Sequence, residues 1–475
     1  MLEVTGGHYM NQHNNYDVII IGAGPAGIFS AYEIVKLNPS AKVLLIEKGK
    51  DIDKRNCPMA NRDIPCANCK PYCSIMTGWG GAGAFSDGKL TLTADYGGWL
   101  DEYLDSKQSV MKYIKYVDDI YLKFGATEKT YGAYDERVAE IERMAATADL
   151  KLIPAEIRHL GTENNLEILS KIRAYLDDKI DYLSSTLVEE IVVETGNKIS
   201  GVRLVNGDIY DATFVIVAPG RVGSEWFRGE CTRLGLSLKN NQVDIGVRVE
   251  VPASSVEHIT KHIYESKLVY YGKKFDDSIR TFCMNPYGDV VVENTDGIMT
   301  VNGHSYASKR SRNTNFALLV SNKFTEPFNE PITYGKYIAT LANMLGGTVI
   351  VQRLGDLKRG RRSTKERIAR GLVTPTLTSA TPGDLSLVFP YRQLTNIIEM
   401  LEALDKVAPG VGSEHTLLYG VEVKFYSSRP ELSKKLETNI DNLFAIGDGA
   451  GVTRGLAQAG ASGIVVAREI VKRMK

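Results

Sequence analysis

The chain has no excess of charge and no long apolar run. Its 475 residues include 57 Lys and Arg and 57 Asp and Glu, so no overall field favours nucleic acid or an anionic membrane. No segment is long and apolar enough to be a membrane span. Residues 1–15 lack the apolar core of a signal peptide and read as a disordered or tag-like segment. We therefore expect a cytoplasmic protein with no nucleic-acid partner.

Cysteine is scarce, but four of the six cysteines lie close together, at Cys57, Cys66, Cys69 and Cys73. Thiolates are soft ligands that suit zinc or an iron–sulfur cluster. The C-x2-C-x3-C spacing differs from the pair of C-x2-C units that is typical of zinc sites. Redox-active thiols beside a cofactor and reduced thiols in an ordinary loop are the open alternatives.

The strongest motif present is a strand, a glycine turn, a helix and a second strand within residues 16–47. Gly22, Gly24 and Gly27 have the G-x-G-x-x-G spacing of a turn that lets a pyrophosphate approach a helix N-terminus. Glu47 ends the second strand, where an acid binds ribose hydroxyls. The unit predicts a dinucleotide site, and its expected contacts are Gly22, Gly24, Pro25, Ala26, Gly27, Glu47 and Lys48.

A glycine-rich segment, GWGGAG at residues 78–83, follows the cysteines within a loop of residues 57–90. Such a run lets the backbone approach a ligand closely, although a flexible linker is the plain alternative. The FSDGKL that continues it favours order, and Ser86, Asp87 and Lys89 are placed to reach a cofactor or substrate. We expect backbone contacts to the cofactor from Gly80, Gly81, Ala82, Gly83 and Ala84.

Residues 442–448 read as a strand that runs into Gly447 and Asp448, and a helix of small residues follows. This arrangement resembles the second FAD signature of flavoproteins with the glutathione-reductase-type FAD domain. The resemblance implies that Asp448 binds the ribityl or pyrophosphate region, whereas a solvent-exposed aspartate is the alternative. The expected contacts here are Gly447, Asp448, Gly455, Leu456, Gln458 and Ala459.

A third segment, residues 215–224, resembles the place where such chains pass the dinucleotide before entering a substrate domain. Aromatic-hydroxylase flavoproteins carry an Asp-Gly pair in a related segment, and its absence here disfavours oxygen insertion. No second strand-coupled G-x-G-x-x-G occurs, so NAD(P)H must dock directly at the flavin, or electrons come from a carrier or the substrate. The expected cofactor contacts in this part are Val188, Ala218, Pro219 and Gly220.

The character of the chain changes near residue 240. Residues 243–252 alternate, with Val and Ile on one face and Asp244, Arg248 and Glu250 on the other, which predicts an antiparallel strand with one polar face. We expect an α/β fold: a Rossmann-like FAD-binding domain at residues 16–240 and 436–475, with an inserted mixed or antiparallel β-sheet substrate domain at residues 241–435. Helices are expected at 100–124, 135–146, 163–178, 332–345 and 394–404, and further strands at 188–193, 201–205, 214–218, 267–271, 280–284 and 289–293.

Several unusual motifs occur in order: the cysteine cluster, GWGGAGAFSDGKL, VDIGVRVEVP, FCMNPYGDVVVEN and IGDGAGVTRGLAQAGASG. Together they resemble the largely uncharacterised bacterial and archaeal FAD-dependent dehydrogenases, a family of NAD(P)/FAD-dependent oxidoreductases. The resemblance implies FAD, the glutathione-reductase-type domain and an insertion like that of hydroxybenzoate-hydroxylase relatives. It implies no particular substrate.

The resulting hypothesis is an oxidoreductase that moves hydride or electrons between flavin and a small organic molecule, for example at a C–C double bond. Tyr287, His304 and Arg248 are the candidate catalytic residues, each with a purely structural alternative. The basic run at residues 358–362 is either an anion site or a solvated face. A flavin monooxygenase and a non-catalytic redox sensor acting through the cysteines are the competing functions, and the oligomeric state is open.

Overall fold

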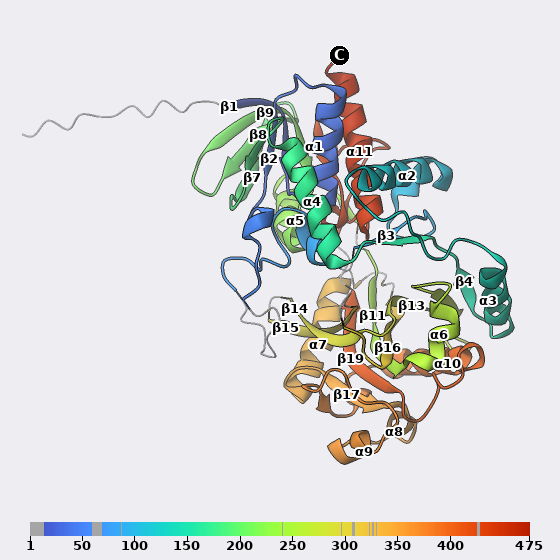
Figure 1. The fold of residues 1–475 in the computed structure, drawn as a ribbon. Helices are drawn as coiled ribbons and strands as arrows, with labels where there is room; N and C mark the ends of the chain where they lie inside the picture. Colours follow the sequence, from blue (N-terminus) through green and yellow to red (C-terminus); the bar gives the residue numbers. More distant parts are fainter. Residues whose placement is uncertain are drawn as a thin grey trace, which may run out of the picture.

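The computed structural model describes residues 14–58, 69–86, 88–239, 241–295, 297–305, 309–322, 324, 327–328, 330–424 and 428–475. Two sheet-based bodies make up the molecule (Figure 1). One contains the strands at both ends of the chain and the other contains the strands between residues 243 and 424. The predicted mixed α/β fold with several sheets is therefore confirmed. None of the helices within the described ranges is long and apolar enough to cross a membrane.

The first body is built on a seven-stranded sheet in the order β6-β2-β1-β9-β8-β7, with β21 paired to β9. The β1, β2, β6, β9 and β21 strands pair in parallel, and β7, β8 and β9 continue as antiparallel hairpins. Because β21 joins β9, the last part of the chain returns to the first sheet. The strands are β1 (Asn14–Ile21), β2 (Val43–Ile46), β6 (Asp181–Leu183), β7 (Val188–Glu194), β8 (Lys198–Leu204), β9 (Ile209–Val217) and β21 (Leu443–Ala445).

Two helices from opposite ends of the chain lie side by side on this sheet, α1 (Pro25–Leu37) and α11 (Leu456–Arg473) (Figure 1). The contact is close because small residues line it. A Cβ atom on Gly463 would lie 2.2 Å from the backbone oxygen of Ala26. The helices α2 (Lys107–Lys123), α4 (Thr162–Leu176) and α5 (Ser224–Arg233) belong to the same body.

The second body is an eight-stranded sheet in the order β18-β17-β19-β11-β16-β13-β12-β4. Its central strand β11 (Val243–Pro252) pairs antiparallel with β16 and β19, as the alternation predicted. The other strands are β4 (Lys151–Ile153), β12 (Lys267–Tyr271), β13 (Ser278–Asn285), β16 (Asn313–Asn322), β17 (Ile350–Arg353), β18 (Thr381–Pro382) and β19 (Leu417–Lys424).

The two faces of β11 are both buried. Its apolar face packs into a core with α7 (Pro331–Gly346) and α10 (Tyr391–Val407). On the other face, Asp244, Arg248 and Glu250 are each 0 % exposed. Alternation therefore identified the strand, but the polar face is not solvated, because the β14–β15 hairpin (Asp289–Thr295 and Ile298–His304) lies against this side of the sheet.

An early segment of the chain crosses into the second body. The α3 helix (Glu136–Thr147) and β4 contribute Val138 and Leu152 to the second hydrophobic core, and β4 pairs with β12. A two-stranded ribbon of β3 (Lys89–Thr91) and β5 (Ile157–His159) lies between the bodies (Figure 1). These residues follow the first βαβ unit in sequence, so the two bodies are joined by more than the two ends of the inserted part.

Most helices begin close to the predicted positions, with one clear difference. The helix expected to begin at residue 100 begins at Lys107 instead, and a short 3₁₀ turn at Leu100–Glu102 precedes it. Ser106 caps α2 by accepting a hydrogen bond from the Ser109 backbone N–H, which is the usual start signal of a helix. The remaining elements are α6 (Ala253–Thr260), α8 (Leu354–Lys358), α9 (Lys365–Ala369), β10 (Leu238–Lys239) and β20 (Arg429–Pro430).

The contact between α1 and α11 predicts a strong effect of a small substitution. Gly463→Ala must push the two helices apart, and we expect it to lower the free energy of unfolding by about 1–3 kcal/mol. Gly229→Ala on α5 is the matched control, since its Cβ would meet no atom within 4 Å. That control should leave stability unchanged or raise it by about 0.5–1 kcal/mol. Urea unfolding of both variants measures this, and equal stabilities would contradict the contact.

Candidate functional site

Of the three glycines in the turn after β1, packing within the protein requires Gly22 and Gly27 to be glycine, whereas Gly24 has room for a side chain. Gly22 has φ +103° and its Cβ would lie 2.1 Å from the Ala218 oxygen. The Cβ of Gly27 would lie 2.0 Å from the Gly22 oxygen. Gly24, which caps α1, would meet nothing within 4 Å. The turn therefore leaves open space in front of the N-terminus of α1, where a phosphate is stabilised by the helix dipole and free N–H groups.

Glu47 joins this turn to the glycine-rich loop. Its buried carboxylate accepts backbone N–H bonds from Ala23 at 2.8 Å, Gly49 at 2.8 Å and Gly78 at 2.9 Å. A carboxylate oxygen can accept two hydrogen bonds, and Oε2 accepts one of these three, from Ala23, so capacity remains for a ribose hydroxyl. Glu47 thus organises both loops, in addition to the ribose contact predicted for it.

The glycine-rich loop is ordered and lies directly against the Gly24 turn. The Gly80 N–H donates to the Ala23 oxygen at 2.7 Å, and a Cβ on Gly81 would lie 3.2 Å from the Gly24 Cα. Residues Gly81–Phe85, which include Ala82 and Ala84, form a 3₁₀ turn, and Gly83 approaches Pro25 and Leu456. The loop therefore lies beside the N-termini of both α1 and α11. Asp87 lies outside the described residues.

Two side chains hold this loop from behind. Arg55 donates to the backbone oxygens of Ser74 at 2.9 Å, Ile75 at 2.8 Å and Trp79. Burial lowers the pKa of Arg55 to about 10, so it remains charged at neutral pH. Trp79 is fully buried and donates its indole N–H to the Leu169 oxygen at 3.0 Å. This packing argues against the flexible-linker alternative.

The C-terminal segment closes the site from the other side. Asp448 accepts a hydrogen bond from the Thr453 hydroxyl at 2.6 Å, and burial raises the pKa of its carboxyl. A Cβ on Gly449 would lie 2.1 Å from the Gly220 oxygen, so the segment after β9 and the segment after β21 touch by their backbones. Gly455 caps α11 and, like Gly24, would meet nothing within 4 Å.

These features fit a flavin dinucleotide. Two helices begin at open glycines on one edge of the sheet, and such helix N-termini stabilise phosphate groups. Near the start of α11, the Gln458 Oε1 and the Tyr96 hydroxyl are buried polar atoms with no partner among the described residues. Gln458 Nε2 meanwhile donates to the Tyr96 backbone oxygen at 2.9 Å. Unsatisfied buried polar atoms are costly, so a ligand with polar ring edges is a suitable partner for them.

The remaining predicted cofactor residues lie around the same edge. Val188 is buried at the start of β7, close to Thr186, whose N–H donates to the Glu47 backbone oxygen at 3.0 Å. Lys48 lies over the ring of Tyr72, at 5.4 Å from its centroid. The structure also brings to this edge Ala26, Ala218, Pro219, Gly447 and Ala459, all in the segments just described.

The cysteine cluster gains no support as a metal site. Cys57 and Cys69 are half-buried and Cys73 is exposed, while Cys66 lies outside the described residues. Within the described ranges, no group of three or more His, Cys, Asp or Glu is arranged to hold a metal ion.

Arg248 is engaged entirely within the protein. Both it and Glu422 are 0 % exposed, and their Nε and Oε2 atoms lie 2.8 Å apart. The guanidinium also donates to the Cys283 oxygen at 2.7 Å and to Asn302 Oδ1 at 3.0 Å. Glu422 has a second cationic partner in Lys424, at 3.1 Å. This geometry favours the structural ion pair over the substrate clamp.

Tyr287 and His304 occupy the ends of the β14–β15 hairpin. Tyr287 has φ +54° in the turn before β14, and its hydroxyl donates to Glu257 Oε1 on α6 at 2.7 Å. His304 ends β15 in register with Asp289. In Tyr287 the hydroxyl is thus occupied by α6, which favours its role as a turn residue.

The basic run at residues 358–362 is neutralised by acids. Lys358 pairs with Glu402 at 2.9 Å, Arg359 pairs with Glu414, and Arg361 lies 2.8 Å from Asp356. The solvated-face interpretation fits this better than an anion site.

The sequence did not predict a cluster of polar groups that lies at the junction of the two bodies. The Lys267 Nζ lies 3.6 Å from the ring centroid of Tyr96, which belongs to the first body. Lys89 bridges to the second body through Glu265 at 3.2 Å and the Met284 oxygen at 3.1 Å. In sequence, Lys267 only begins a predicted strand, and nothing local indicates that residues near Tyr96 cover it.

Lys267 is a strongly perturbed basic group of the junction. Burial, together with the nearby Arg280 and Arg454 charges, lowers its pKa to about 6, against the opposing effect of Glu265 and Asp244. Large shifts caused by burial and by specific charges gather at functional sites.

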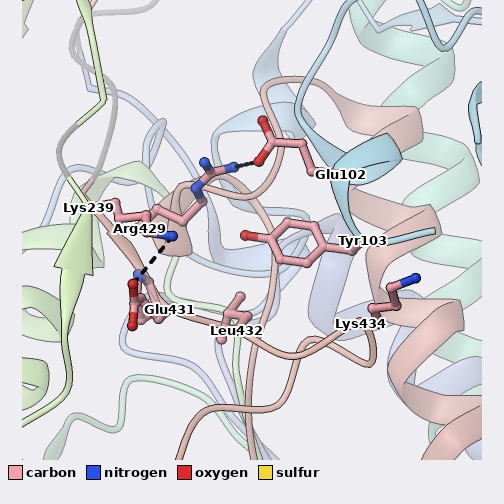
Figure 2. A pocket seen from close by; sticks show the side chains of 8 residues that line it. Glu102, Tyr103, Lys239, Arg429, Glu431, Leu432 and Lys434 are labelled. Atoms are coloured by element: carbon pink, nitrogen blue, oxygen red, sulfur yellow. Dashed lines mark hydrogen bonds and ion pairs between the residues drawn. The ribbon is translucent and has the colours of Figure 1, made fainter. Parts of the chain in front are cut away.

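A separate cavity has a volume of about 320 Å³ (Figure 2). Its charges are paired with one another or with neighbours: Arg429 with Glu102 at 2.8 Å and Lys239 with Glu431 at 3.3 Å. The Arg429 guanidinium lies 5.3 Å from the Trp99 ring centroid, and that of Arg454 lies 3.7 Å from the same ring. Trp99 thus contacts both Arg429, which lines the cavity, and Arg454, which lies just before α11. It is lined by Glu102, Tyr103, Lys239, Arg429, Pro430, Glu431, Leu432 and Lys434.

Comparison with known proteins agrees with a flavin site. Residues 242–425, which form most of the second body, match the family described as "FAD-dependent protein, C-terminal domain-like". An uncharacterised protein of Clostridium beijerinckii is 28 % identical over 96 % of this chain and 80 % of its own length. The family match supports an FAD-dependent protein, and it covers less than half of the chain.

Solved structures that resemble the chain include oxidoreductases of several kinds. The fumarate reductase subunit FrdA of E. coli is 14 % identical, over 97 % of this chain and 70 % of that one, with a TM-score of 0.40. Glycine oxidase of Geobacillus kaustophilus is 14 % identical over 97 % and 95 %, at 0.39. A 3-ketosteroid dehydrogenase of Rhodococcus jostii is 11 % identical over 98 % of both chains, at 0.43. These likenesses identify no substrate.

The buried ion pair predicts an asymmetric mutational effect. Arg248→Met leaves Glu422 buried, with Lys424 as its remaining cationic partner among the described residues. We expect a loss of about 3–5 kcal/mol in the free energy of unfolding, because Lys424 alone compensates the buried carboxylate of Glu422 only in part. The double variant Arg248→Met/Glu422→Met should recover at least half of that loss in urea unfolding. If Arg248→Met were as stable as the parent protein, the structural role of Arg248 would be contradicted and a role in binding substrate would be favoured.

Proposed function

We propose that this protein is an FAD-dependent oxidoreductase that transfers hydride or electrons between bound FAD and a small organic molecule. One observation carries the proposal. The α1 and α11 helices, from opposite ends of the chain, both begin at glycines with free space in front of them, Gly24 and Gly455. The glutathione-reductase-type arrangement of this domain is part of the proposal. The family match to residues 242–425 supports FAD as the dinucleotide.

The roles of the holding residues follow from their places in the fold. The Gly24 turn and the first N–H groups of α1 would bind the pyrophosphate. Glu47 would accept bonds from the adenosine ribose. Asp448 would bind the ribityl or pyrophosphate region, and Gln458, at the start of α11, would face a polar edge of the flavin. When bound, the flavin supplies the hydride and electron chemistry of the reaction.

The substrate is proposed to lie at the junction of the two bodies, where Lys89, Glu265, Lys267 and Tyr96 meet. These side chains come from both bodies and are largely buried, so they would exclude water and orient a small molecule. Oxidation at a C–H bond next to a second ionisable C–H or X–H bond, or the reverse reduction of a double bond, suits such a site. NAD(P)H docking at the flavin or an electron carrier would close the catalytic cycle.

The open glycines provide a direct test of FAD binding. Neither Gly24 nor Gly455 has a positive φ, and an added Cβ meets no protein atom, so Gly24→Ala and Gly455→Ala should fold normally. Each methyl group fills space reserved for the cofactor, and we expect FAD affinity to fall by about tenfold or more, or about 1.4 kcal/mol. Titration of the apoprotein with FAD, followed by flavin fluorescence, measures this.

Gly229→Ala serves as the control, because its Cβ is equally unhindered but lies within α5, which begins at neither of the two open glycines. Its FAD affinity should equal that of the parent protein. A parent protein that stays colourless after reconstitution with FAD would overturn the proposed function. Unchanged affinity in both glycine variants would show that the cofactor lies elsewhere.

A further inference from the structure

We propose that Lys267 is the proton-transfer residue of the junction site, accepting a proton from the substrate as its hydride leaves. The inference rests on the proposed function, because it assumes that FAD binds beside the start of α11. Lys267 is the first residue of β12 in the second body, and it stands on the ring of Tyr96 from the first body. Through this contact, a basic side chain of the second body touches the proposed cofactor domain.

Residues 96–98, which include the Tyr96 that contacts Lys267, are hydrogen-bonded to the start of α11 and to the residues before it. The Tyr96 oxygen accepts a bond from Gln458, and the Gly97 oxygen accepts one from the Arg454 N–H at 2.8 Å. Gly98 forms a bridge with Thr453, whose hydroxyl binds Asp448. One connected piece of structure therefore carries both the platform of Lys267 and the groups proposed to hold the flavin.

Charged groups face Lys267 from every element around it. Arg280 on β13 and Arg454 before α11 are cationic, and Lys89 on β3 is held near by Glu265. The nearest acids already have other cationic partners, Asp244 with Arg280 and Glu265 with Lys89. None of the described carboxylates forms an ion pair with Lys267 itself. The amine of Lys267 is therefore half-buried, close to the positive charges of Arg280 and Arg454, and not paired with a described carboxylate.

This setting leaves a lone pair available at neutral pH. Burial and the two arginines lower the pKa of Lys267 to about 6, so the neutral amine predominates above that pH. Burial raises the pKa of Tyr96 well above its usual value, so its hydroxyl stays protonated and cannot compete as the base. Of the two side chains that meet in this contact, Lys267 and Tyr96, Lys267 is therefore the one able to accept a proton.

The step balances as follows. In the oxidation, one C–H bond of the substrate breaks, and FAD, when bound, would supply the acceptor for the hydride that carries away its electron pair. The neighbouring C–H or X–H bond breaks, its electron pair forms the new double bond, and its proton goes to the Lys267 amine. The resulting ammonium returns the proton to solvent. In the reverse direction the ammonium donates the proton, so the oxidation needs pH above about 6 and the reduction is favoured below it.

The first test measures the amine directly. Reductive methylation with ¹³C-formaldehyde labels lysine amines, and the NMR signal of each dimethyl-lysine is then followed against pH in the protein reconstituted with FAD. We expect one signal to titrate several pH units below the others and to be missing in Lys267→Met. Lys273→Met, which removes an exposed lysine paired with Asp149 at 3.4 Å, should keep it. Titration of every lysine near its ordinary pKa would overturn the proposal.

The second test uses sulfite, an anion that forms an adduct with oxidised flavin and bleaches its visible absorbance. Adduct formation should become several-fold tighter as pH falls through about 6 in the parent protein and in Lys273→Met, because the Lys267 ammonium stabilises the anionic adduct. The Lys267→Met variant should lack that step and keep only the change due to ionisation of sulfite. If the parent protein binds no FAD, the proposed function fails; if FAD binds and the step persists in Lys267→Met, the role of Lys267 alone fails.

Discussion

The structure depends on close backbone contacts at one edge of the first sheet. Gly22 lies against Ala218, Gly449 against Gly220 and Gly463 against Ala26, at positions where an added Cβ would come within about 2.2 Å of a backbone oxygen. No other residue fits such contacts. Because these glycines bring three separate chain segments together, the starts of α1 and α11 open onto the same space. The proposed cofactor site is a consequence of that packing.

The sequence predicted this edge well because its signals are local. Glycine spacing, an apolar strand and a terminal acid all act within one βαβ unit, and Gly447 and Asp448 follow a short strand in the same way. The packing that makes the loop rigid was not predictable. Arg55 and Trp79 hold it through backbone oxygens, and such bonds leave no pattern in the sequence.

The second body shows where a periodic pattern stops being informative. Alternation identified β11 and sorted its residues into two faces, but it does not say what covers each face. Arg248 therefore looked available to a substrate, whereas Glu422, Asn302 and the Cys283 backbone enclose it. The pairing of β4 with β12 escaped prediction for a related reason, since a three-residue strand far away in sequence has too weak a local signal.

Lys267 illustrates how function can arise from contacts between bodies. At the start of a strand, a lysine is ordinarily solvated and charged, whereas here Tyr96 lies against the amine, and burial with the nearby Arg280 and Arg454 lowers its pKa to about 6. Tyr96 occupies its place because the segment after it is bound to the start of α11. The same contacts that would position a flavin therefore also create the environment that lowers the pKa of the amine. A base at this point needs the two bodies packed together, so the proton-transfer group would be assembled only in the complete fold.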